Sequence, residues 1–276
     1  MTSTGRIAAT AALLGLLAGC GAATREEAPL DTFDAATIFQ RGEFELEAGD
    51  EEEAARYFGE VERLYPYSEL AQRALIMQAF AYHQADAYEL SRASAQRYLD
   101  FFRGSEDSAY AQYLLALSYY DQIDDVGRDQ GLTFQALQAL REVIELYPDS
   151  EYARSAVLKF DLAFDHLAAK EMEIGRYYLA RGYFPAAVNR FRVVVEDFQT
   201  TTHTPEALLR LVEAYLSLGL LEEAQTAGAI LGYNYRSSPF YQDAFALLRG
   251  RGLAPEAAGE SWLRTVYRRV VRGDQI

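Results

Sequence analysis

The stretch from Lys170 to Phe198 constrains the fold more than any other part of the chain, because it has the spacing of a two-helix unit. Small and aromatic residues recur in it at fixed intervals, namely Gly175, Tyr178, Gly182, Phe184, Ala187 and Phe191. Gly175 allows one helix to approach its partner closely, and Gly182 permits a left-handed turn between the two helices. Ala187 and Phe191, one turn apart, present a small and then a large side chain to Tyr178. Because such a pair cannot bury its apolar face alone, similar neighbours are expected.

The same spacing recurs along the chain and is typical of the tetratricopeptide repeat, a two-helix unit of 34 residues. The alanine-type position falls at residues 54, 91, 136, 187 and 224, with steps of 37, 45, 51 and 37 residues. These steps predict repeats over about 36–68, 70–106, 108–150, 152–200 and 204–238, which together form a domain over 33–240. An insertion of about eight residues lies around 123–130. We therefore expect an all-α, right-handed superhelical solenoid of about five helix pairs plus a C-terminal helix.

The largest step, 51 residues, predicts one long helix from near Tyr152 to about Arg181. It would cross between two parts of the solenoid, and no proline lies between Pro148 and Pro185 to interrupt it. After residue 240 the region 241–276 is expected to form a helical cap or tail. There the segment Ser261–Arg272 reads as a last helix with an apolar side made of Trp262, Val266, Tyr267 and Val270. We expect this apolar side to cover the end of the last repeat rather than to bind a partner protein.

Composition excludes several classes of function. The formal net charge is −15 and no basic run occurs, which argues against nucleic-acid binding. The chain has one cysteine, and its three histidines are far apart in the sequence, so no metal site is expected. No phosphate-binding glycine loop and no nucleophile motif occur, and the acidic clusters lie where helices begin. We therefore expect no catalytic residue, no cofactor and no enzymatic activity.

The first residues have the features of a bacterial lipoprotein signal. An apolar run over residues 7–17 is too short to span a bilayer and is followed by Leu17-Ala18-Gly19-Cys20. This ending resembles a lipobox, which implies removal of residues 1–19, diacylglycerol on the Cys20 sulfur and an acyl chain on its new amino group. An ordinary secretory signal that ends in cysteine is the alternative. Residues 20–32 are small, polar and proline-containing, so we interpret them as a flexible tether.

The lipobox and the repeats occur together with three longer segments: LYPYSE at 64–69, LYPDSEYA at 146–153 and KEMEIGRYYLARGYFPAAVNRF at 170–191. Together they resemble the BamD family, the lipoprotein subunits of the machine that assembles β-barrel proteins in the outer membrane. The resemblance covers about residues 30–240. It implies a periplasmic scaffold on the inner leaflet of the outer membrane, whose partners are the BamA insertase (through a POTRA module), the other Bam lipoproteins and unfolded β-barrel proteins.

The resemblance also points to two groups of candidate partner-binding residues. Five residues of the first and second repeats would receive a substrate peptide, namely Tyr65, Tyr67, Phe80, Tyr82 and Gln84. For these aromatic side chains core packing is the competing interpretation. The insertase would contact the connection 199–206 through Thr202, His203 and Glu206. This connection also reads as a plain turn between helices, with Thr204 capping the helix that follows.

A second function remains open at this stage. The chain could be a tetratricopeptide lipoprotein that coordinates cell-wall synthesis or envelope constriction. Proteins of that kind often carry an N-terminal coiled coil, and no heptad run of three or more occurs here. The pattern therefore favours the outer-membrane assembly machine.

Overall fold

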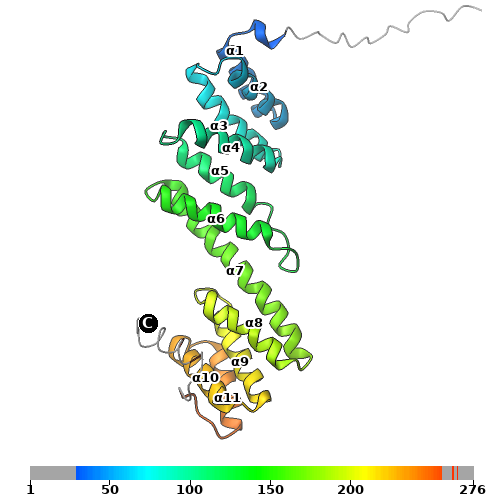
Figure 1. The fold of residues 1–276 in the computed structure, drawn as a ribbon, viewed down its shortest axis with the longest axis vertical. Coiled ribbons are helices and arrows are strands. Elements are labelled where there is room, and N and C mark those ends of the chain that lie inside the picture. The colour runs from blue at the N-terminus through cyan, green and yellow to red at the C-terminus, as the bar shows by residue number, and fades with distance from the viewer. Residues whose placement is uncertain (1–28, 257–262, 264–265, 267–276) are drawn as a thin grey trace, which may run out of the picture.

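The computed structural model describes residues 29–256 together with Leu263 and Val266, and it is all-helical in these residues. Figure 1 shows an elongated stack in which each helix packs against the next one along the chain. Within residues 29–256, a short 3-10 turn at Leu30–Thr32 precedes eleven α-helices: α1 (Ala35–Ala48), α2 (Glu51–Leu64), α3 (Glu69–Gln84), α4 (Tyr88–Phe102), α5 (Ser108–Tyr120), α6 (Gly131–Leu146), α7 (Glu151–Ala180), α8 (Phe184–Asp197), α9 (Thr204–Leu218), α10 (Leu221–Asn234) and α11 (Pro239–Gly250).

Several helices begin at a side chain that accepts a hydrogen bond from the backbone of the first turn. Asp34 accepts from the Thr37 amide, Asp50 from Glu53, and Ser68 from Ala71. Ser150 starts α7 in the same way by accepting from Ala153. Each of these bonds satisfies one amide that the helix itself leaves unpaired, so the polar residues before the apolar stretches fix where the helices start.

The close approach that the glycine pattern predicts is present in two pairs. A Cβ atom on Gly175 would lie 2.4 Å from the ring of Phe191, and one on Gly42 would lie 2.8 Å from the ring of Phe58. Both phenylalanines are fully buried. Gly182, between α7 and α8, has a φ of 75°, which confirms the left-handed turn. The phenylalanine ring on the second helix of each pair (α2 or α8) therefore occupies the space that glycine leaves on the first helix (α1 or α7).

The second and third pairs depart from the pattern in their connections. Between α3 and α4 the left-handed position is taken by Asp86, whose φ is 56° and whose carboxylate accepts a hydrogen bond from the Tyr88 hydroxyl at 2.7 Å. Between α5 and α6 the insertion forms the loop 121–130, as predicted. Lys170 of α7 donates to the Gly127 carbonyl at 2.7 Å and so holds this loop against α7.

The predicted long helix is α7, which has 30 residues and is about 45 Å long. Its first half packs on α6, where Ala156 shares a core cluster with Leu140 and Val143. Its second half packs on α8, where Met172 shares a cluster with Phe191. Figure 1 shows α7 as the element that joins the upper helices α1–α6 to the lower group α8–α11.

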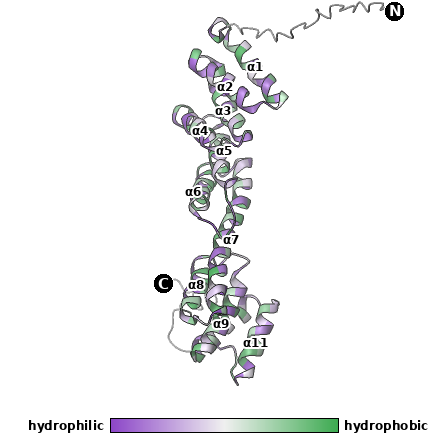
Figure 2. Ribbon diagram, turned by 90° about the vertical axis from the view of Figure 1, so that its right-hand side faces the viewer, coloured by the Kyte–Doolittle hydropathy of each residue, from purple (hydrophilic) through white to green (hydrophobic). Residues whose placement is uncertain are grey.

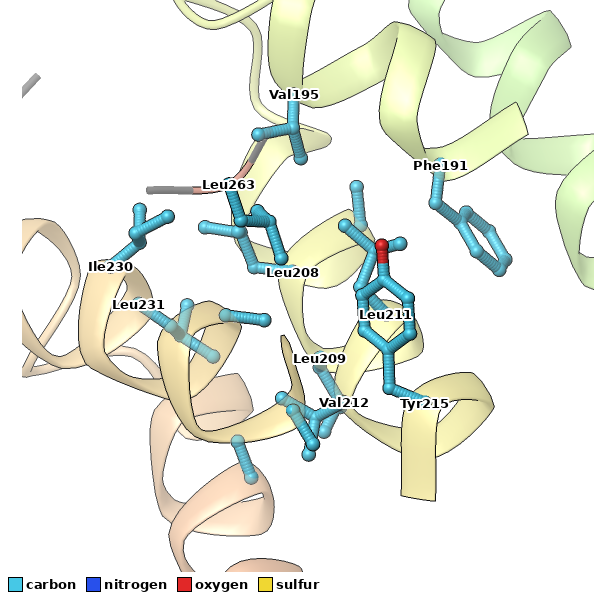
Figure 3. Packing of buried hydrophobic residues seen from close by; sticks show 14 of the residues in the cluster. Phe191, Val195, Leu208, Leu209, Leu211, Val212, Tyr215, Ile230, Leu231 and Leu263 are labelled. Carbon is cyan, nitrogen blue, oxygen red and sulfur yellow. The ribbon is translucent and has the colours of Figure 1, made fainter. Parts of the chain in front are cut away.

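The largest core cluster holds the C-terminal helices together. Figure 3 shows Leu208, Leu211 and Val212 of α9 in the middle of this cluster, with α8 and α10 on either side. Leu263 and Val266 are buried in the same cluster, and Leu263 lies beside Val195. The expected apolar side of the last helix is thus corrected, because it includes Leu263. The other residues placed on that side, Trp262, Tyr267 and Val270, lie outside the described residues.

The helices mix hydrophobic and hydrophilic residues along their lengths (Figure 2). Among residues 29–256 no helix has the length and the apolar character needed to cross a bilayer.

Candidate functional site

A polar hollow of about 470 Å³ lies between α2 and α4, with α3 as its floor. We call it the N-terminal groove. Its lining comes from all three helices and consists of Arg56, Gly59, Glu60, Glu62, Arg63, Gln78, Tyr82 and Arg97. The groove thus lies between the second helices of the first two pairs, α2 and α4, and across α3, the first helix of the second pair.

Gln78 is the centre of this groove and joins its three helices. Its side-chain amide donates to the Ala55 carbonyl of α2 at 3.2 Å, and its carbonyl oxygen accepts from Ser94 and Arg97 of α4, each at 3.1 Å. Gly59 leaves the necessary room, since a Cβ atom there would lie 2.3 Å from the Gln78 nitrogen. With both ends of its amide paired, buried Gln78 holds the groove in one shape.

The walls of the groove carry paired charges. Arg97 of α4 reaches Glu62 of α2 at 2.6 Å and bridges the opening. On α2 itself, a hydrogen bond from Arg63 lowers the pKa of Glu60 below its usual value, so Glu60 stays ionised. The groove therefore offers both guanidinium donors and carboxylate acceptors beside the ring of Tyr82. Such a lining suits an extended peptide, whose backbone needs donors and acceptors at once.

The five candidate residues for substrate do not converge on one site. Tyr82 lines the N-terminal groove, but Phe80 and Gln84 lie on the opposite face of α3, because two residues along a helix correspond to a rotation of about 200°. Phe80 packs against the cluster that contains Leu75 and Tyr98, while Gln84 is exposed.

The two tyrosines of the connection between α2 and α3 differ in role. The Tyr65 hydroxyl donates to the Phe33 carbonyl, and both side chains pack on the core cluster of α1–α3 that contains Ile38 and Phe58, which we call the first core cluster. Arg41 lies over the ring of Phe33 at 4.0 Å, so the segment before α1 is fixed to the first pair. Tyr67 is fully exposed and belongs to no core cluster of the described residues. Of the two, Tyr67 is the one with a free surface.

The second candidate group lies on the connection between α8 and α9, which is fixed to α7. Asp165 accepts hydrogen bonds from the Thr202 amide at 2.9 Å and from the Thr202 hydroxyl at 2.8 Å. His203 lies 3.3 Å from the other oxygen of the same carboxylate. Glu206 forms salt bridges with Arg176 at 2.9 Å and with Arg210 at 3.3 Å. Thr202 and His203 thus meet at one carboxylate, whereas Glu206 pairs with two arginines. Asp165 could not be predicted from the sequence, because it is 37 positions from Thr202.

The capping role expected for Thr204 is wrong. The residue before α9 is His203, whose side chain makes no capping hydrogen bond, and Thr204 is the first helical residue. The Thr204 hydroxyl donates instead to the Phe198 carbonyl at 3.0 Å and to the Gln199 carbonyl at 3.2 Å. It therefore satisfies carbonyl groups at the end of α8, which the helix leaves unpaired.

No group of three or more metal-ligating side chains comes together within residues 29–256. Cys20, the predicted lipidation site, lies outside the described residues.

Comparison with known proteins gives the family. The model of the YfiO family, described as "Outer membrane lipoprotein", matches residues 31–230. The outer membrane protein assembly factor BamD of Caulobacter vibrioides is 45% identical over 245 residues, which cover 87% of this chain and 79% of the relative. The chain belongs to the BamD family. BamD of Rickettsia prowazekii is 39% identical over 237 residues, or 86% of this chain and 94% of the relative.

The family match includes both candidate sites, since the N-terminal groove and the connection 199–206 fall within residues 31–230. Among solved structures, that of PilW, a type IV pilus biogenesis factor, aligns with 75% of this chain and 96% of its own length at 14% identity. Its TM-score of 0.34 is too low to support an argument about fold or function. Membership of the BamD family therefore depends on the sequence.

Proposed function

We propose that this member of the BamD family is a lipid-anchored periplasmic scaffold subunit of the outer-membrane β-barrel assembly machine, with no catalytic role. The observation that supports this most strongly is the 45% identity to a relative named an outer membrane protein assembly factor. The all-helical stack suits a scaffold, because an elongated array offers several separate surfaces to partners.

Lipid on Cys20 would hold the N-terminal pair close to the membrane. The chain from Cys20 to Leu30 spans ten residues, which reach at most roughly 35 Å when fully extended. Leu30 and Phe33 pack on the first core cluster, so the free tether ends there. Leu30, where the first helix pair begins, would stay within that reach of the inner leaflet.

The N-terminal groove is the site that we propose for unfolded β-barrel proteins. Tyr82 offers a ring for an aromatic side chain, and Arg97 and Glu62 offer a donor and an acceptor at the opening. An extended chain leaves its backbone groups unpaired, so these polar groups would satisfy them. Tyr67, exposed on the connection that leads from α2 into α3, could extend the contact.

Replacing Arg97 with glutamine is expected to weaken peptide binding about tenfold, because one charge-assisted hydrogen bond contributes roughly 1.5 kcal/mol. The probe is a labelled peptide with the last ten residues of an outer-membrane barrel protein, titrated by fluorescence anisotropy. Arg103→Gln is the control, since Arg103 is exposed at the end of α4 and does not line the groove. Equal affinity of the two variants would rule out the groove.

The connection 199–206 is the site that we propose for the BamA insertase. Its shape depends on Asp165, which holds Thr202 and His203, and on Arg176, which holds Glu206. Reversing the charge of Glu206 would break its salt bridges as well as any partner contact. A clearer test therefore removes the contact that holds the connection on α7 and leaves the exposed side chains of the connection unchanged.

Replacing Asp165 with alanine is expected to reduce recovery of the insertase several-fold, because the connection loses two hydrogen bonds worth roughly 1–3 kcal/mol together. Recovery is measured by co-purification from envelopes solubilised in mild detergent. Glu173→Ala, an exposed acidic residue about two turns later on α7, is the matched control. If both variants recover the insertase as the parent chain does, the contact lies elsewhere.

A further inference from the structure

The middle of α7 exposes an unusual amount of apolar surface. Val157, Leu158 and Leu162 are 42%, 68% and 62% exposed, although they lie in the helix that joins the two halves of the stack. Helix α6 packs on the other side of this part of α7, where Ala163 shares a cluster with Leu137, and α8 lies beside the following turns (Figure 1). The surface is therefore a helix face without a partner in residues 29–256.

The register of α7 explains why this face is bare. The residues that face α8, including Ala168, Met172 and Gly175, continue towards the N-terminus in steps of three and four to Phe164, Asp161 and Val157. However, α8 ends at Asp197, and the ring of Phe198 reaches only to Phe164, at 4.8 Å between centroids. Val157 and Asp161 in the next two turns are therefore left uncovered, and the exposed Leu158 and Leu162 lie about 100° further round the helix beside them.

Acidic groups border the bare face. Asp161 is exposed between Val157 and Leu162, and Asp165 follows one turn later. Asp197 is exposed at the end of α8, where the helix dipole adds partial negative charge. A segment that covers this face should therefore combine apolar side chains with arginine or lysine.

The chain itself carries such a segment next to this place. Leu263 and Val266 are buried in the C-terminal cluster, and Figure 3 shows Leu263 beside Val195, in the last turn of α8. The sequence continues with Tyr267-Arg268-Arg269-Val270-Val271-Arg272. Ten residues, 267–276, reach up to roughly 33 Å, whereas Phe164 and Val157 are only about 10 Å apart along α7.

We propose that residues 267–276 bind across the face of α7 formed by Val157, Leu158, Asp161 and Leu162. The valines and Tyr267 would cover the exposed apolar side chains, and the arginines would pair with Asp161 and Asp197. Docking there braces the helix that joins the two halves of the scaffold, so the angle between the halves depends on this contact. The inference is independent of the proposed partners.

Thiol accessibility tests the proposal on the full chain. With Cys20 replaced by serine the chain has no other thiol, so Leu158→Cys introduces a single reactive site. We expect this cysteine to react with a maleimide at least about threefold more slowly than in the same chain ended after Val266, because docking must open before reaction. Leu90→Cys, at a position 51% exposed on α4, is the matched control and should react alike in both chains.

A second variant excludes effects of truncation on folding. The full-length chain with Arg268, Arg269 and Arg272 all replaced by glutamate should react at position 158 as fast as the shortened chain. The slow rate should also persist at about tenfold dilution, as expected for docking within one chain. Equal rates at position 158 with and without the segment would overturn the proposal. The proposal would also fail if removal of the segment accelerated the maleimide reaction at both position 158 and position 90. It would fail too if the slow reaction at position 158 became fast on dilution.

Discussion

Replacing Phe191 with alanine is expected to lower the free energy of unfolding by about 3–5 kcal/mol, the usual range for a fully buried phenylalanine. The ring fills the space beside Gly175, where a Cβ atom would come within 2.4 Å, so no nearby side chain stands ready to fill the cavity. Because a repeat array is stabilised by contacts between neighbours, the loss should affect α7–α9 most. Urea denaturation followed by circular dichroism measures the change.

The matched control for this prediction is Phe44→Ala. Phe44 lies on α1 and is 66% exposed, so its removal should change stability by less than about 0.5 kcal/mol. A similar small change for Phe191→Ala would mean that the α7–α8 pair is not packed through its phenylalanine, and the repeat interpretation of this stretch would fail.

Replacing Cys20 with alanine is expected to move nearly all of the chain from the membrane fraction to the soluble fraction once the envelopes are washed at high pH, which breaks contacts with membrane proteins but leaves lipid anchors in place. Acyl chains on one residue contribute about 0.8 kcal/mol for each buried methylene group, so several chains together give stable anchoring. No described helix could take over this role by crossing the bilayer. Fractionation of envelopes and mass spectrometry of the N-terminal peptide measure the two effects.

The control for the anchor is Thr24→Ala, which changes the proposed tether and leaves the cysteine intact. This variant should remain in the membrane fraction and keep its lipid. A Cys20→Ala chain that stays with the membrane after the high-pH wash, or a wild-type N-terminal peptide without acyl groups, would contradict the lipoprotein assignment.

The helix pairs could be predicted from sequence because their signals are local. Gly175, Gly182 and Phe191 fix the approach, the turn and the buried ring within one stretch of the chain, and the structure confirms each of them. The long helix α7 followed from the spacing of the repeats and the absence of proline. The exposed apolar face of α7 could not be predicted in this way. Its exposure depends on where α8 ends along α7, which is set by how the two helices pack.

The candidate sites were harder to predict because they depend on contacts between distant residues. Gln78 reads as an ordinary polar residue of α3, and only the meeting of α2, α3 and α4 makes it the centre of a groove. Asp165 gives no local sign that it holds the connection after α8. The separation of Phe80 from Tyr82 could have been foreseen, since two residues on a helix point in opposite directions.

The most direct test of the account is to purify the full-length chain with a C-terminal tag from envelopes solubilised in mild detergent. The partners are then identified by mass spectrometry, with Cys20→Ser as the control for anchoring. A subunit of the barrel assembly machine should recover a β-barrel protein of the outer membrane that carries POTRA modules, at a level that falls in the Asp165→Ala variant. Recovery of cell-wall synthases without such a barrel protein would contradict this assignment and would favour a scaffold of cell-wall synthesis.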